Sequence, residues 1–133
     1  MDITVINQAK TENWMVCVYG LGYLGKRLYK EIPSIFGLSA NYYSDGSDDK
    51  VDNVILPEMT GIYKDELLKI KEPVLVFILV DDPYDIEIQK NLSLNVKLHT
   101  ITLRELTQMK EVIIYFYGNK FYAEYICLPD NSV

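Results

Sequence analysis

The sequence predicts an α/β domain built on a doubly wound, mainly parallel sheet. Segments of strand length alternate with segments whose apolar residues recur at helical spacing. Residues 74–80 form a continuous apolar run rich in β-branched side chains, as in central strands that are buried on both faces. Alternating strands and helices predict parallel strands joined by right-handed crossovers.

Length and composition narrow the class of protein. The 133 residues, 49% hydrophobic and 24% charged, suit one globular domain spanning residues 1–133. A net charge of −6 argues against a general nucleic-acid binder, which needs a cationic surface. The N-terminus lacks the pattern of a secretion signal and no apolar run is long enough to span a bilayer. We therefore expect a cytoplasmic protein without membrane insertion.

The cysteines and the single histidine do not predict a metal site. Cys17 and Cys127 are far apart, and together with His99 they cannot supply four zinc ligands. Small buried thiols in a reducing compartment are the simpler interpretation.

In the first half of the chain, short apolar runs predict strands at residues 3–6, 15–19 and 40–44. Leu24, Leu28 and Ile32 recur at helical spacing, and Pro33 is expected to end that helix. Residues 45–49 read as a polar turn rich in Asp and Gly, and residues 53–56 as an extended piece.

The second half continues the alternation. We expect a helix at residues 62–70, the central strand at 74–80, a helix from Pro83 to Leu92, a strand at 96–102 and a helix at 103–109. Asp82 precedes Pro83 and is predicted to cap the helix that follows.

The C-terminal segment departs from the alternation. Residues 112–117 and 121–126 flank Gly118-Asn119-Lys120, which predicts a β-hairpin after a core of residues 14–110. Aromatic side chains occupy both faces of this ribbon, so another part of the chain or a second chain must cover it. We expect a homo-oligomer through residues 111–127, because tyrosine is enriched at interfaces.

The most informative motif is Gly20-Leu21-Gly22-Tyr23-Leu24-Gly25, a G-x-G-x-x-G between a predicted strand and a predicted helix. In such loops the first glycine permits a tight turn, the second admits a pyrophosphate and the third lets helix and strand pack closely. All six residues are candidate ligand contacts. The alternative is that these glycines only make the turn and no ligand binds.

Two aspartates are further candidates for the same site. Asp45 lies 20 residues after Gly25, where an acidic side chain can accept hydrogen bonds from a ribose diol. The acidic residues around Asp45 disfavour a ligand with a 2′-phosphate. An alternative of equal weight is that Asp45 belongs to a solvated turn and contacts no ligand. Calcium or magnesium binding has little support, because the spacing matches no EF-hand loop. Asp81 follows the central strand, where ligands bind in open α/β sheets.

The stretch from residue 16 to residue 29 resembles the opening of small Rossmann-like domains in bacterial surface-polysaccharide proteins. Such domains occur at the N-termini of sugar O-acyltransferases and beside some glycosyltransferases and methyltransferases. The resemblance covers about residues 14–107. It implies a nucleotide or nucleotide-sugar ligand, with Gly20, Gly22, Gly25 and Asp45 facing it. Tyr29 departs from the pattern, which has a small residue there, and its ring is expected to push the helix away from the sheet or to rotate it.

Three functions remain open at this point. The first is binding of a nucleotide, either a nucleotide-sugar or an NAD-like molecule, in surface-polysaccharide synthesis. The second is a degenerate module without ligand that mediates self-association. The third is a small oxidoreductase, which is disfavoured because the sequence shows no acid–base pair such as Tyr-x-x-x-Lys and no G-x-S-x-G elbow.

Overall fold

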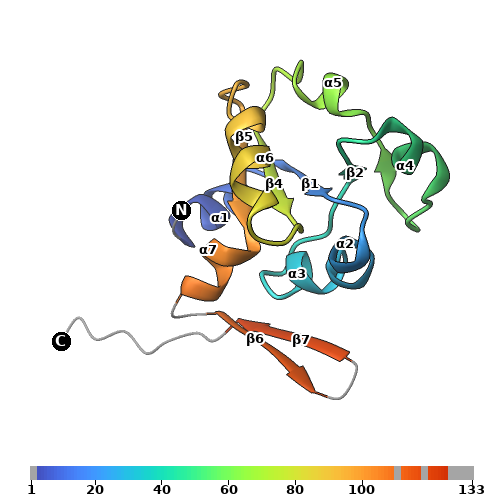
Figure 1. Cartoon of the computed structure of the whole chain (residues 1–133). Coiled ribbons are helices and arrows are strands. Elements are labelled where there is room, and N and C mark those ends of the chain that lie inside the picture. Colours follow the sequence, from blue (N-terminus) through green and yellow to red (C-terminus); the bar gives the residue numbers. More distant parts are fainter. Residues whose placement is uncertain (1–2, 110–111, 118–119, 126–133) are drawn as a thin grey trace.

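Five parallel strands form the centre of the molecule (Figure 1). The computed structural model describes residues 3–109, 112–117 and 120–125. The sheet order is β3-β2-β1-β4-β5, and every pairing in it is parallel. Its strands are β1 Met15–Tyr19, β2 Tyr42–Ser44, β3 Thr60–Gly61, β4 Val74–Ile78 and β5 Leu98–Thr102. This arrangement confirms the predicted α/β fold with a doubly wound, Rossmann-like sheet.

Alternating side chains of the central strands build two hydrophobic layers. In β1 and β4, Val18 and Phe77 point to one face of the sheet, whereas Cys17 and Val76 point to the other. Every residue of β4 is buried, as the unbroken apolar run predicts. Each fully buried aliphatic or aromatic side chain adds roughly 1.5–3 kcal/mol to the stability of the folded state. Both layers therefore stabilise the domain.

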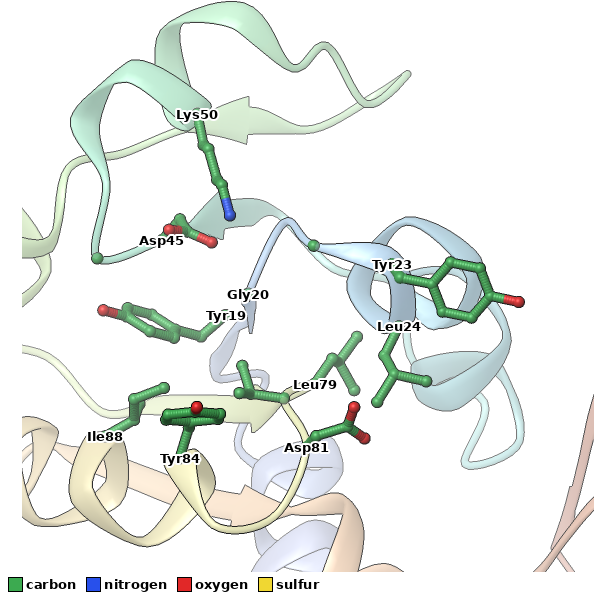
Figure 2. Close-up of a pocket in the computed structure, with 13 residues that line it drawn as sticks. Tyr19, Gly20, Tyr23, Leu24, Asp45, Lys50, Leu79, Asp81, Tyr84 and Ile88 are labelled. Carbon is green, nitrogen blue, oxygen red and sulfur yellow. The ribbon is translucent and has the colours of Figure 1, made fainter.

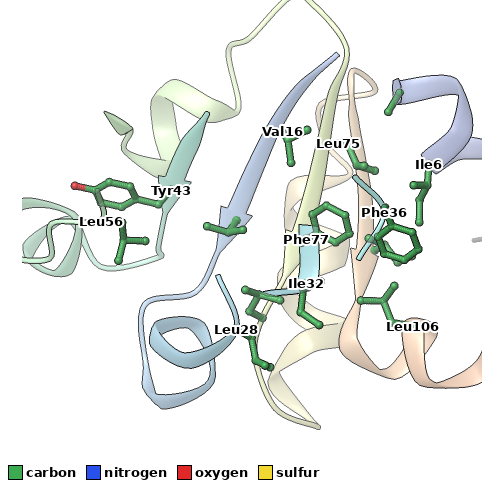
Figure 3. Packing of buried hydrophobic residues seen from close by; sticks show 14 of the residues in the cluster. Ile6, Val16, Leu28, Ile32, Phe36, Tyr43, Leu56, Leu75, Phe77 and Leu106 are labelled. Carbon is green, nitrogen blue, oxygen red and sulfur yellow. The ribbon is translucent and has the colours of Figure 1, made fainter. Parts of the chain in front are cut away.

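Helices cover both faces of the sheet. On one face lie α1 Ile3–Thr11, α2 Tyr23–Leu28, α3 Glu31–Ser34 and α7 Leu103–Gln108, which bury Ile6, Leu28, Ile32 and Leu106 (Figure 3). The other face is covered by α5 Lys64–Leu67 and α6 Tyr84–Leu92, through Leu67 and Leu92. The neighbouring strands β1 and β4 thus lead into helices on opposite faces, which is the topological switch point of the sheet.

The predicted strand at residues 3–6 is wrong, because this segment begins α1. A segment of four residues is too short to show whether its apolar side chains recur with the helical or the strand period. Ile6 and Ala9, three positions apart, are both buried, and α1 packs against β4. Tertiary packing of one helical face therefore decided the conformation.

The helix after the glycine loop ends earlier than predicted. It stops at Leu28, and a second short helix, α3, contains Pro33 instead of ending before it. Pro33 is tolerated because it lies in the first turn, where a backbone N–H has no intrahelical acceptor. Tyr29 is the C-cap of α2 and packs half-buried against the core. The predicted displacement is not seen at the start of the helix, where Gly25 packs directly on Gly20.

Several predicted boundaries shift by a few residues. The helix at 62–70 is confined to α5, and the polar turn at 45–49 passes at Asp48 into a helix, α4 Asp48–Asn53, capped by the Ser47 side chain. The strand at 96–102 begins at Leu98, since residues 96–97 form a turn in which Val96 is largely exposed. The short edge strand β3 was not predicted from the sequence.

The predicted helix cap at Asp82 is also wrong. Pro83 occupies the N-cap position of α6 and no side chain caps that helix. The carboxylate of Asp82 instead lies 2.7 Å from Nη2 of Arg104. The same guanidinium makes a two-pronged contact with the buried carboxylate of Asp85, at 3.2 and 3.0 Å. Arg104 thereby ties the start of α6 to α7.

Two further strands, β6 Val112–Tyr117 and β7 Lys120–Tyr125, pair antiparallel beyond α7. The predicted turn at Gly118 and Asn119 lies outside the described residues, as do Cys127 and the aromatic side chains on which the oligomer prediction rests. Within the part of the chain that the structure describes, every helix is too short or too polar to cross a membrane.

Candidate functional site

Two glycines of the loop between β1 and α2 are required by their surroundings. Gly20 has a φ of +111°, which side-chain-bearing residues rarely adopt, and an added Cβ would lie 2.7 Å from Val80 Cγ2. A Cβ on Gly25 would lie 1.8 Å from the carbonyl oxygen of Gly20. The first glycine therefore allows the turn, and the third allows the helix to approach the strand.

Gly22 is different, because none of the described residues other than its own chain neighbours has an atom within 4 Å of the position that its Cβ would occupy. It is the N-cap of α2, and no side chain caps the helix there. The first N–H groups of a helix have no intrahelical acceptor, so the amides of Gly22, Tyr23 and Leu24 remain available. Backbone amides in this arrangement suit an anionic group.

Asp45 fastens the glycine loop to the end of β2. Its Oδ2 accepts a hydrogen bond of 2.7 Å from the Leu21 amide, and its Oδ1 accepts one of 2.9 Å from the Ser47 amide. The Leu21 side chain points away from the loop into the core. A carboxylate has about four acceptor positions, so each Asp45 oxygen retains one for another donor.

A pocket of about 380 Å³ opens above this loop (Figure 2). It lies at the carboxyl ends of β1 and β4, where the topological switch point predicts a ligand site. Of the predicted residues it includes Gly20, Gly22, Tyr23, Leu24, Asp45 and Asp81, whereas Leu21 and Gly25 support the loop from behind. It also includes residues that the sequence analysis missed: Tyr19, Gly46, Lys50, Leu79, Val80, Tyr84 and Ile88.

The pocket has a polar part and an apolar part. The polar part combines the start of α2 with Lys50, whose ammonium group points toward the Asp45 side of the pocket (Figure 2). No carboxylate of the described residues forms a salt bridge with Lys50. The apolar part is lined by Val80, Ile88 and the largely exposed ring of Tyr84, and Asp81 lies at the rim.

Tyr19, the last residue of β1, is 3% exposed and still lines the pocket. Burial of the phenol, reinforced by the negative charge of Asp45 and by the Cys17 thiolate that forms at high pH, raises the pKa of Tyr19. The hydroxyl is therefore protonated at neutral pH and can donate a hydrogen bond. A Cβ added to Gly46 would lie 3.4 Å from this hydroxyl oxygen.

Other chemistry-bearing residues do not line the pocket. Arg27 on α2 lies over the ring of Tyr23, with its guanidinium carbon 4.4 Å from the ring centre. His99 contacts Trp14 at the opposite, amino end of the sheet. In the ranges that the structure describes, no three His, Cys, Asp or Glu side chains are grouped so as to hold a metal ion.

Comparison of the chain with models of protein families, with curated proteins and with solved structures gave no significant match. The function must therefore be inferred from the geometry of this pocket.

Proposed function

We propose that this domain binds a nucleotide in the pocket between the ends of β1 and β4. The observation that carries the proposal is the open space at Gly22, directly in front of the uncapped first turn of α2. The two glycines that the fold needs are packed against other atoms, whereas the fold does not need a glycine at position 22. A glycine there serves the close approach of a phosphate to the backbone.

The phosphate is proposed to lie at the amides of Gly22 and Tyr23. These donors supply hydrogen bonds, and the ammonium group of Lys50 supplies a positive charge on the same pocket. The carboxylate of Asp45 faces two backbone amides, which partly offset its charge beside the anion.

The nucleoside is proposed to occupy the remaining part of the pocket. Tyr84 and Ile88 offer an exposed aromatic ring and an aliphatic side chain on which a base can stack, a contact worth about 1–3 kcal/mol. At about 380 Å³ the pocket is near the lower end of ligand sites, which span roughly 300–1,000 Å³. It suits one nucleoside phosphate, and the sugar of a nucleotide-sugar or the second half of NAD would extend beyond it.

Thermal-shift measurements with NAD, NADP, UDP-sugars and CMP-sugars test the proposal. A ligand at 100 times its Kd should add about 2.7 kcal/mol to the unfolding free energy. We expect a shift with at least one ligand that has a free ribose diol, a smaller one with NADP, and none in folded Gly22→Val. Surface-polysaccharide synthesis, suggested by the sequence resemblance, would be favoured if the sugar nucleotides give the largest shift.

The alternative is a module without ligand that acts in self-association. The internal bonds of Asp45 favour it, because they give that carboxylate a structural role. Wild-type protein that none of these nucleotides stabilises would support this alternative. An equal shift in Gly22→Val would also count against the phosphate position.

A further inference from the structure

The hydroxyl of Tyr19 lacks a hydrogen-bond partner in the part of the chain that is described. The charge of Asp45 acts on it, yet no hydrogen bond joins the two groups. A phenol this deeply buried normally has its hydroxyl bonded, because an unpaired polar group costs free energy. The missing partner is therefore a feature to explain.

Solvent reaches this hydroxyl through the pocket. Among the described residues, Ser44 Oγ is the side-chain atom that is both sealed from solvent and unpartnered. The Tyr19 hydroxyl is also unpartnered and is not sealed, and it lies beside Gly46 on the wall of the pocket. A molecule in the pocket can take the place of that solvent.

Two neighbouring groups of this wall have complementary chemistry. Asp45 can only accept hydrogen bonds, and each of its oxygens retains a free position. Protonated Tyr19 donates. A ligand group that fits both must donate a hydrogen bond to Asp45 and accept one from Tyr19. A hydroxyl does both, whereas a carbonyl or a methylene does not.

We propose that Tyr19 and Asp45 together recognise a ribose hydroxyl, so that the site prefers ribonucleotides over deoxyribonucleotides. Tyr19 is then a specificity-determining residue of the pocket. This inference rests on the proposed nucleotide binding and adds to it the sugar that is selected. A site built to hydrogen-bond a ligand hydroxyl rejects the analogue that lacks it, because its own polar groups are left unpaired.

The inference predicts opposite effects of one substitution on stability and on binding. Tyr19→Phe removes an unpartnered hydroxyl from the free protein, so the melting temperature should stay the same or rise. The same change removes a donor to the ligand and should weaken binding. Ser44→Ala is a matched control, because it also removes a buried unpartnered hydroxyl but on a residue that does not line the pocket.

The experiment is calorimetric titration of wild type, Tyr19→Phe and Ser44→Ala with AMP, UMP and CMP and with their 2′-deoxy and 3′-deoxy forms. We expect wild type and Ser44→Ala to bind a ribonucleotide about tenfold or more tightly than one deoxy form. Tyr19→Phe should lose about tenfold in affinity for the ribonucleotide and most of this preference.

A Tyr19→Phe protein that keeps the ribose preference, or that melts at a clearly lower temperature, would overturn the role of Tyr19. Equal binding of ribose and deoxyribose forms to wild type would overturn it too. In that case, loss of all binding in Gly22→Val would leave the proposed function standing. Failure of every nucleotide to bind wild type would overturn both proposals.

Discussion

At the scale of single residues, the three glycines of the loop differ in the room around them. Gly20 and Gly25 are enclosed by Val80, Leu79 and each other, whereas the space at Gly22 is open. The motif therefore combines two positions that the fold requires with one that it does not. This difference can be measured without knowing the ligand.

We predict that Gly25→Ala lowers the unfolding free energy by roughly 3 kcal/mol or more, because its Cβ would overlap the Gly20 carbonyl oxygen at 1.8 Å. Gly22→Ala should lower it by about 1 kcal/mol or less, since the space is free and the cost is that of alanine as a poorer N-cap residue than glycine. Urea denaturation of both variants measures the difference. Equal losses would contradict the proposed division of roles.

Cys17 gives a pH-dependent prediction. Burial raises the pKa of its thiol from 9.0 to about 12, so the folded protein keeps a proton that the unfolded chain loses above pH 9. Stability from this group is complete below pH 9 and falls as pH rises toward 12, by at most about 1.4 kcal/mol per unit.

Urea midpoints of wild type and Cys17→Ala between pH 8 and 11 test this dependence. The wild-type midpoint should fall more steeply above pH 9, and Tyr19 should leave some slope in the variant because its pKa is raised as well. Parallel curves for the two proteins would show that the thiol does not contribute.

At the scale of secondary structure elements, Arg104 of α7 holds the loop that leads into α6. It pairs with Asp85, whose side chain is 2% exposed, and with Asp82, whose side chain is 73% exposed. The ion pair with buried Asp85 should matter more to the unfolding free energy than the pair with exposed Asp82, because water screens the exposed pair. With Asp82 drawn toward Arg104, Asp81 is the aspartate of this loop that lines the pocket at the ends of β1 and β4.

We predict that Arg104→Met lowers the unfolding free energy by about 3 kcal/mol, since among the described residues it leaves the buried carboxylate of Asp85 with the Ile86 amide as its remaining partner. Asp82→Ala should cost less than about 1 kcal/mol. The double variant Asp85→Leu/Arg104→Met should recover much of the loss, and chemical denaturation measures all three. Additive losses in the double variant would show that the two side chains are not coupled.

The sequence predicted those elements best whose residue pattern fits only one kind of secondary structure. The apolar run of β4 and the loop motif after β1 located the centre of the sheet and the start of α2. The helical α1 was mistaken for a strand because, over so short a segment, Ile3 and Val5 fit the strand period while Ile3 and Ile6 fit the helical one. Asp82 was mistaken for a cap because its true partner, Arg104, is distant in sequence.

At the scale of the whole molecule, the sheet order positions the candidate site. Because β1 and β4 are neighbours, the glycine loop, Asp45 and Asp81 meet at one edge, as the expected parallel topology implied. Tyr19, Lys50 and Tyr84 were missed, because a tyrosine, a lysine and an exposed ring carry no motif of their own. Their positions at the end of β1, in α4 after β2 and at the start of α6 after β4 are the signal that would have found them.

Self-association through residues 111–127 stays a prediction. Aromatic residues on both faces of a two-stranded ribbon need a covering surface, and a second copy of the chain can supply it. We expect light scattering at tens of micromolar to give the mass of a dimer or a larger assembly, and Tyr117→Glu or Tyr122→Glu to reduce it. A monomer mass that neither substitution changes would contradict this prediction.

The most direct test of the nucleotide site is an NMR titration that follows the backbone amides of ¹⁵N-labelled protein. The ligands are those of the thermal-shift measurements. We expect the largest shifts at Gly22, Tyr23 and Leu24, with smaller ones at Gly46 and Lys50, and little change at Trp14 and His99 at the other end of the sheet. Saturating shifts centred elsewhere, or none with any of the nucleotides, would contradict a nucleotide site at the start of α2.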